Sequence, residues 1–278
     1  AASPEFTLPI ACEVGTDFVL SDMDAMRAGV DVLASASGVV RGVRNDMRDI
    51  NVRKIGVAAV KGRECGNGLV LAHEDGWETQ YCHMRRGSVI VKSGDYIRQG
   101  SKLGLVGLSG LTEMPHAHLS VRHNGDVIDP FNPINSSCDA GVQSLWKPGI
   151  MADIGLPQSA VYHLGFTGET PDIERARNGD YDGDTISANA KALVFWADMF
   201  WVEPTDKITL SITAPNGSKF ASTTDTPDNI QARRIIFVGK KNKGKPWPVG
   251  TYEGTVQIKR VLDDGSFRTI KHSSTVRV

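Results

Sequence analysis

The N-terminal half of the chain carries short runs of alternating apolar and polar residues that are separated by glycine. Residues 68–73 (GLVLAH) and 77–84 (WETQYCHM) flank the turn Glu74-Asp75-Gly76 and predict a β-hairpin. Between residues 88 and 110, glycine recurs among brief apolar runs. This spacing predicts a tightly turning antiparallel sheet.

A second hairpin is predicted near the end of this half. Residues 116–122 (HAHLSVR) lead into Asn124-Gly125, which is a strong signal for a tight hairpin turn. The segment 129–133 (DPFNP) follows, and its prolines cannot continue a strand. We therefore place the first domain at residues 7–134 and a polar connector at 135–157.

From about residue 158 the pattern changes to longer strands. Strands are predicted at residues 192–202, 207–214, 233–238, 251–261 and 268–278. Their regular spacing is typical of a β-sandwich with about seven short strands. The predicted fold class is therefore mainly β, with an antiparallel β-sheet core followed by an Ig-like β-sandwich domain at 158–278.

The composition restricts the classes of partner. The formal net charge is -1, which gives no electrostatic case for binding nucleic acid or an anionic membrane surface. No run reaches the roughly 18 apolar residues that a membrane span needs, so no span is expected. Residues 1–6 (AASPEF) read as a cloning remnant and are left out of the fold prediction.

The four cysteines are Cys12, Cys65, Cys82 and Cys138, and none belongs to a C-x-x-C pair of the kind that binds structural zinc. Structural cysteines are therefore expected. Cys65 and Cys82 lie close together across the first predicted hairpin, but a disulfide between them needs an irregular strand end. Whether they pair is left open, and a disulfide would indicate an oxidising compartment.

Two histidines on one predicted strand form a candidate site. Side chains at positions i and i+2 of a strand point to the same face, so His116 and His118 would share one face. By itself the pair fits either a metal or catalytic site, or two polar residues on a solvated face.

His83 stands near the end of the first predicted hairpin. Regular alternation would place Tyr81 and His83 on one face of the strand and Cys82 on the other. Cys82 is therefore expected to point away from whatever His83 faces. Taken alone, His83 also fits an exposed position on a strand.

Together, these segments follow a longer pattern. YCHM (81–84) is followed by VKSGDYIRQGSKLGLVGLSG (91–110) and PHAHLSVRHNGDVIDP (115–130). In residue type and order this stretch resembles the core of the lysostaphin-like (LytM-type) zinc metalloendopeptidases. Upstream, GTDF (15–18) and AGVDVLASASGVV (28–40) resemble the first strands of the same family.

The resemblance implies a zinc centre. In the family, Zn²⁺ is held by the histidine and aspartate of an H-x-x-x-D motif and by the second histidine of H-x-H, and water takes the fourth position. Carried over, Asp17 and His118 would be Zn²⁺ ligands. His116 would be the general base for the attacking water, and His83 would donate a hydrogen bond to the developing oxyanion or leaving group.

One ligand of the family pattern is absent. Four residues before Asp17 the family has histidine, whereas this chain has Glu13. Glutamate can bind zinc, but only three residues separate Glu13 from Asp17, and Glu13 adjoins Cys12, which is expected to be structural. We therefore expect either that a segment is missing between Cys12 and Gly15, or that the third protein ligand is not Glu13.

The implied activity is hydrolysis of peptide cross-links in bacterial peptidoglycan, in the periplasm or outside the cell. A different class stays open, in which the chain is a degenerate, metal-free member that serves as a binding or activator module for another wall hydrolase. A third reading is a peptidase that acts on secreted proteins. The presence of Asp17, His83, His116 and His118 together favours the enzyme. The second domain shows no catalytic constellation and is expected to contact the substrate or a protein partner.

Overall fold

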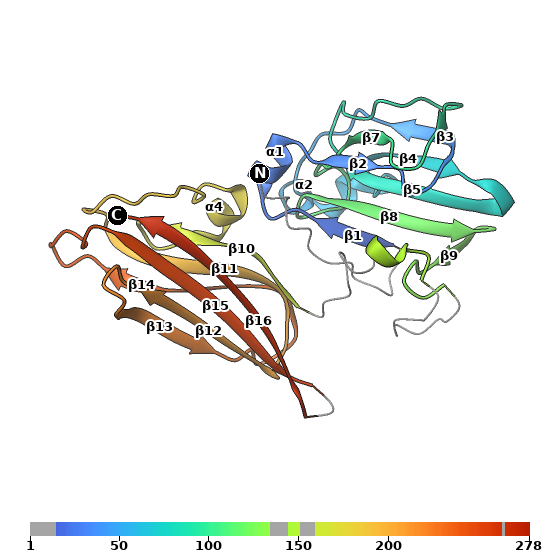
Figure 1. Ribbon diagram of the computed structural model, residues 1–278. Coiled ribbons are helices and arrows are strands. Elements are labelled where there is room, and N and C mark those ends of the chain that lie inside the picture. Colours follow the sequence, from blue (N-terminus) through green and yellow to red (C-terminus); the bar gives the residue numbers. More distant parts are fainter. Residues whose placement is uncertain (1–14, 134–143, 151–158, 263–264) are drawn as a thin grey trace. The chain divides into compact units, whose positions relative to one another are not determined.

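The structure is a computed structural model that describes residues 15–133, 144–150, 159–262 and 265–278. The chain divides into two compact units, residues 1–156 and 157–278 (Figure 1). Both units are built mainly from antiparallel strands. The mainly β fold class predicted from the sequence is therefore confirmed.

In the described part of the N-terminal unit, the strands form a seven-stranded sheet in the order β1-β8-β5-β4-β3-β6, with β9 paired to β8, and a small sheet of β2 and β7. The strands are β1 (Thr16–Val19), β2 (Asp31–Leu33), β3 (Gly38–Arg44), β4 (Asn67–Ala72), β5 (Trp77–Met84), β6 (Tyr96–Ile97), β7 (Lys102–Leu105), β8 (His116–His123) and β9 (Asp126–Ile128). Short helical segments are α1 (Met23–Ala28), α2 (Val52–Ile55), η1 (Val57–Val60) and η2 (Glu74–Gly76).

Both hairpins predicted in this unit are present. Strands β4 and β5 are joined by η2, and the His73 N–H donates to the Trp77 carbonyl at 2.8 Å. Strands β8 and β9 are joined through Asn124 and Gly125, both of which have positive φ. Tight hairpin turns require such φ values, and Asn and Gly adopt them at low cost.

The large sheet has one face in the hydrophobic core. Leu69, Tyr81 and Leu119 lie opposite one another on β4, β5 and β8, and all three are buried. The Tyr81 hydroxyl reaches beyond the core and accepts a hydrogen bond from the Ser35 N–H at 2.8 Å. Since side chains alternate across a strand, the neighbours of these residues point to the opposite face, where the polar residues lie.

In the described part of the C-terminal unit, two sheets form the predicted sandwich, with strand orders β10-β11-β14 and β13-β12-β15-β16. Its elements are β10 (Ala160–Thr167), α4 (Ile173–Asn178), β11 (Ala192–Val202), β12 (Asp206–Thr213), β13 (Lys219–Asp225), β14 (Gln231–Lys241), β15 (Thr251–Val261) and β16 (Phe267–Arg277). Strands β10 and β13 were not among the predicted strands. No helix among the described residues is long and apolar enough to cross a membrane.

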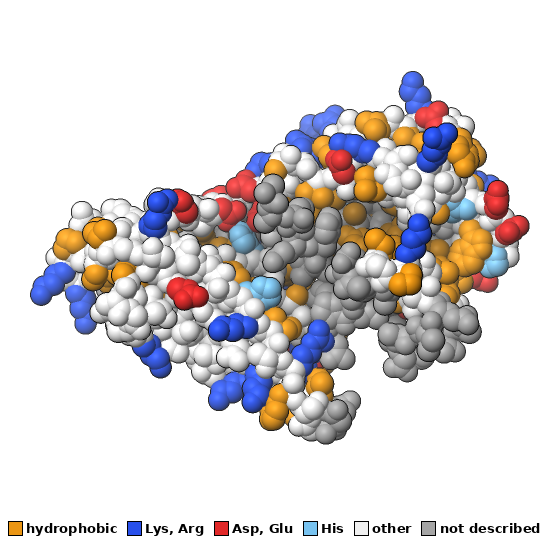
Figure 2. All heavy atoms as spheres, viewed as in Figure 1, with side chains coloured by type: hydrophobic (Ala, Val, Ile, Leu, Met, Phe, Trp, Pro, Cys, Tyr) orange, Lys and Arg blue, Asp and Glu red, His pale blue; other side chains and the backbone are white. Residues whose placement is uncertain are grey.

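The core of the sandwich comes from alternate residues of its strands. Phe195, Ile208, Tyr252 and Val256 are fully buried between the two sheets. Figure 2 shows that the face of this unit that carries β15 and β16 is mostly white, with charged side chains of both signs scattered over it. The unit also buries an ion pair, in which Arg260 contacts Asp206 at 2.7 Å.

Candidate functional site

Three neighbouring strands, β1, β8 and β5, bring the predicted site residues together. Asp17 on β1 lies directly opposite His118 on β8, and His118 in turn lies opposite Cys82 on β5. Residues that lie opposite each other in an antiparallel pair project to the same side. The strand register therefore fixes Asp17 and His118 on the face of the sheet that is away from Leu119 and the core.

The second histidine of the strand joins the same cluster. The Asp17 Oδ1 atom is 2.6 Å from His118 Nδ1 and 3.4 Å from His116 Nε2. Burial by itself would raise the pKa of the Asp17 carboxyl, but the His118 hydrogen bond and the nearby His116, His118 and His83 rings outweigh it and lower that pKa. Asp17 is therefore ionised at neutral pH.

His83 completes the cluster from β5. Its ring centroid is 4.6 Å from that of His116 and 5.9 Å from that of His118. One ring nitrogen from each of the three histidines lies within 4.8 Å of the other two. Three imidazoles and a carboxylate thus meet at one place, and these are donor groups that zinc prefers.

Each imidazole is held through a ring nitrogen. His83 Nδ1 lies 2.7 Å from the Ser109 carbonyl oxygen, and His116 Nδ1 lies 2.9 Å from the Met114 carbonyl oxygen. A carbonyl can only accept, so Nδ1 carries the proton in both rings and, in the neutral rings, Nε2 presents a lone pair to the cluster. His118 contacts Ser120 Oγ through Nε2 at 3.0 Å.

A β-bulge places His83 in the cluster. Asn67 pairs with Met84 and Leu69 pairs with Tyr81, so two residues of β5, Cys82 and His83, lie opposite Gly68 alone. The extra residue is accommodated because His83 has φ of 58°, in the left-handed region. A non-glycine residue there costs on the order of 1–3 kcal/mol, which the surrounding contacts must offset.

The bulge corrects one prediction. Regular alternation would put His83 on the core face with Tyr81 and would turn Cys82 away from the surroundings of His83. Instead, Cys82 shares its face with His118, and the His83 ring contacts the His118 ring. The prediction was wrong because an inserted residue reverses the alternation beyond it.

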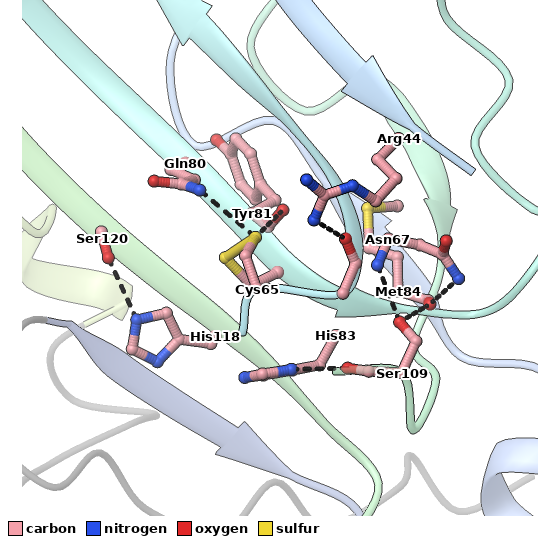
Figure 3. The surroundings of a disulfide bond; sticks show 12 residues. Arg44, Cys65, Asn67, Gln80, Tyr81, His83, Met84, Ser109, His118 and Ser120 are labelled. Carbon is pink, nitrogen blue, oxygen red and sulfur yellow. Dashed lines mark hydrogen bonds between the residues drawn. A yellow bond between two sulfur atoms is a disulfide. The ribbon is translucent and has the colours of Figure 1, made fainter. Parts of the chain in front are cut away.

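Cys65 and Cys82 form a disulfide beside the cluster, as Figure 3 shows. Cys65 lies in the turn before β4, and the His83 N–H donates to the Cys65 carbonyl at 2.8 Å. The bridge that sequence reasoning left open is therefore present. The irregular strand end that it needs is the bulge.

Burial controls the charge of His83. Desolvation, and then the charge of His116, lower the pKa of His83 to about 3, although the hydrogen bond to the Ser109 carbonyl acts in the opposite direction. His83 is therefore neutral at physiological pH. As a neutral ring with its proton on Nδ1, it accepts hydrogen bonds at Nε2 and donates there only after it takes up a second proton.

Sequence reasoning missed the groups that hold these rings. Ser109, Thr112 and Ser120 are buried, and Thr112 Oγ1 lies 3.1 Å from His116 Nδ1. In the sequence, Ser109 is marked only by the glycines on either side of it, and Thr112 and Ser120 only by their closeness to His116 and His118. Glu13 and the expected break between Cys12 and Gly15 involve residues 1–14, which lie outside the described residues.

A cavity of about 760 Å³ lies elsewhere in the unit. It is lined in part by Thr79, Leu119 and Val121, which belong to the core side of the sheet, and none of the four clustered residues lines it. The cavity and the cluster therefore lie on opposite faces of the sheet.

Comparison with known proteins agrees with this location. Residues 15–130 match the profile of peptidase family M23. This segment is a peptidase family M23 domain. The M23 domain contains Asp17, His83, His116 and His118, whereas the C-terminal unit lies outside the match.

Relatives of the M23 domain carry peptidase names. It is similar to the DD-carboxypeptidase/endopeptidase Mpg of Neisseria meningitidis, with 35% identity over 82 residues, 29% of this chain and 18% of Mpg. It is also similar to the peptidoglycan DD-endopeptidase ShyA of Vibrio cholerae, with 30% identity over 112 residues, 40% of this chain and 20% of ShyA. The chain thus matches about a fifth of the length of these curated relatives.

Solved structures include a zinc-containing peptidase from Vibrio cholerae. The two sequences are 25% identical, and the match covers 46% of this chain and 33% of the Vibrio cholerae chain, with a TM-score of 0.31.

Proposed function

We propose that this chain is a zinc metalloendopeptidase that hydrolyses peptide cross-links of bacterial peptidoglycan. The observation that carries the proposal is the convergence of Asp17, His83, His116 and His118 on one face of the sheet inside the M23 domain. The name of ShyA, a peptidoglycan DD-endopeptidase, supports the substrate class. The Cys65–Cys82 disulfide supports an oxidising location, in the periplasm or outside the cell.

The donor set of the site fits zinc. We assign Asp17 and His118 as ligands, because the Asp17 oxygen and His118 Nδ1 face each other and the far nitrogen of His118 contacts Ser120. A ligand imidazole held at its second nitrogen is the usual arrangement in metal sites. Bound there, zinc would polarise the scissile carbonyl and lower the pKa of a water molecule.

His116 is assigned as the general base. Its Nδ1 proton is held by the Met114 carbonyl, so Nε2 is free to accept a proton from water beside Asp17. The resulting imidazolium is stabilised by the Asp17 carboxylate, 3.4 Å from Nε2. His116 can then return the proton to the leaving amine.

His83 is assigned to hydrogen bonding with the oxyanion or the leaving group. Because its Nδ1 proton is held by the Ser109 carbonyl, His83 donates from Nε2 only in its doubly protonated form. The proton that His83 donates is therefore the one that His116 takes from water, so the two neighbouring rings offer alternative routes for this proton to the leaving amine.

The test is digestion of whole sacculi by the purified chain, with and without a strong chelator. Cleavage of peptide cross-links that stops with chelator and returns with Zn²⁺ is expected. Cleavage that resists the chelator contradicts the zinc mechanism. A casein gel run in parallel separates wall peptides from secreted proteins as substrates.

The competing function, a metal-free binding or activator module, predicts a different result. Glu13 stands where the family has a histidine, and this is the observation that favours the module. Such a protein would bind sacculi or stimulate another wall hydrolase without cleaving anything itself. Under either function, we assign the C-terminal unit to contact with the wall or with a protein partner.

A further inference from the structure

The left-handed backbone of His83 needs support from its surroundings. The bulge is directly joined to Cys65, whose sulfur is bonded to Cys82 and whose carbonyl accepts the N–H of His83 at 2.8 Å. One residue of the preceding turn therefore holds both residues of the bulge, once covalently and once by a hydrogen bond.

A second set of contacts holds the other side of the bulge. Ser109 accepts from the His83 ring through its carbonyl, and its hydroxyl donates to the Met84 carbonyl at 2.8 Å. The same hydroxyl accepts the Asn67 N–H at 2.8 Å. Asn67 and Ser109 are both fully buried, so these contacts are shielded from water.

The two sets of contacts differ in what they restrain. Ser109 restrains Nδ1 of the His83 ring and the carbonyl of Met84. Cys65 restrains the backbone N–H of His83 and the side chain of Cys82. Without the covalent bond, the turn that carries Cys65 is held to Cys82 and His83 mainly by one backbone hydrogen bond. A bulge held from one side only can revert toward regular pairing, which would turn His83 away from His116.

We propose that Cys65, through its disulfide to Cys82, is a positioning residue for His83. The inference rests on the proposed peptidase function for its kinetic consequence, but its structural consequence is independent of it. Breaking the bond moves the His83 ring out of its place beside His116. The ligands Asp17 and His118 lie on β1 and β8 and keep their register.

The test compares the Cys65→Ser/Cys82→Ser variant with the unaltered chain. The expected kcat on a soluble cross-linked peptidoglycan fragment is about 100-fold lower, since a misplacement of about 1 Å has an effect of this size. KM and bound zinc are expected to be unchanged. In ¹H–¹⁵N spectra, the His83 ring is expected to lose its single Nδ1–H form, which the Ser109 carbonyl selects.

Two controls accompany this comparison. Gln80 Nε2 contacts Cys65 Sγ at 3.2 Å, so Gln80→Ala removes a neighbour of the bridge and leaves the disulfide in place, and we expect unchanged kinetics and spectra. Treating the unaltered chain with a dithiol breaks the S–S bond, as two electrons and two protons pass to the cysteines and the dithiol becomes a disulfide. This treatment should reproduce the lower kcat and the changed His83 spectrum of the variant, and reoxidation should restore both.

An unchanged His83 spectrum in the folded variant overturns the proposal, as does a fall in activity that follows loss of zinc. If the serine variant does not fold, Cys65→Ala/Cys82→Val keeps the site apolar and takes its place. If the unaltered chain cleaves nothing, the proposed function fails, and the His83 spectra still decide whether the disulfide positions the ring.

Discussion

Asp17 and His118 face each other across β1 and β8, and the Asp17 carboxylate accepts a hydrogen bond from His118 Nδ1 over 2.6 Å. The two residues are 101 positions apart in the chain, and the strand register alone brings them together. Loss of a residue that only supports a metal ligand typically lowers metal affinity by about 10–100-fold. Because His118 is assigned as a ligand itself, His118→Ala should lower zinc affinity by more than about 100-fold. Metal analysis of the dialysed protein checks this.

The residues beside the metal should behave differently from its ligands. His116→Ala and His83→Ala are expected to lower kcat by about 10²–10⁴-fold, the usual size of a general acid–base contribution, with zinc content nearly unchanged. Both rings are held at Nδ1 by backbone carbonyls, which remain in place whichever of the two histidines is replaced. Loss of zinc from His83→Ala would show that the three clustered histidines hold the metal and that our division of roles is wrong.

The stability of the metal-free protein should depend on pH through His83. Its pKa is about 3 in the folded chain against 6.5 for an ordinary histidine, so between these values the unfolded chain binds a proton that the folded chain does not. The free energy of unfolding is therefore fully maintained above pH 6.5 and falls as the pH is lowered toward 3.

From pH 7 to pH 4, the expected loss from His83 alone is on the order of 3 kcal/mol. Urea unfolding at both pH values measures the total change. The matched variant is His83→Asn, because asparagine tolerates the left-handed region and does not titrate. An equal loss of stability in this variant would show that His83 is not the group responsible.

The bulge itself can be tested at Gly68. A Cβ on Gly68 would lie 1.9 Å from the Tyr81 carbonyl oxygen, which is backbone and cannot swing away. We expect Gly68→Ala to destabilise the chain by about 3 kcal/mol or more. Gly42→Ala on the neighbouring strand β3 is the control, since nothing lies within 4 Å of a Cβ there.

The control should be neutral or stabilise the chain by about 0.4–1 kcal/mol, because alanine reduces the entropy of the unfolded state. Equal urea midpoints for the two variants would mean that the tight packing of Gly68 against β5 is absent in solution. A lower kcat in Gly68→Ala, relative to Gly42→Ala, is also expected, since His83 lies opposite Gly68.

The hairpins were predictable because their signals are local. Asn124-Gly125 and Glu74-Asp75-Gly76 are turn sequences between alternating runs, and both turns are present. The sandwich strands that were predicted also alternate or are strongly apolar. Strand β13 has no fully buried residue, and buried and less buried positions do not alternate regularly along β10, so neither stood out from the surrounding sequence.

The orientation of His83 could not be derived from alternation. The segment Tyr81-Cys82-His83-Met84 contains no glycine or asparagine, the residues that usually mark a left-handed position. The bulge is set by partners far along the chain, the Cys65 turn and Ser109. His83, His116 and His118 were candidates from their positions on predicted strands, and the family resemblance added Asp17 and the roles of all four. The groups that hold these residues become evident only once the strands are paired.

The C-terminal unit should fold alone and lack peptidase activity. Its core residues, including Phe195 and Tyr252, and its buried Arg260–Asp206 pair all belong to the unit itself. Residues 158–278, expressed separately, should therefore unfold cooperatively and bind no zinc. Residues 1–157 should keep the activity of the full chain on a soluble peptide fragment but cleave whole sacculi more slowly, because they lack the proposed wall contact. Equal rates on sacculi for the short and full chains would show that the C-terminal unit does not direct the enzyme to its substrate.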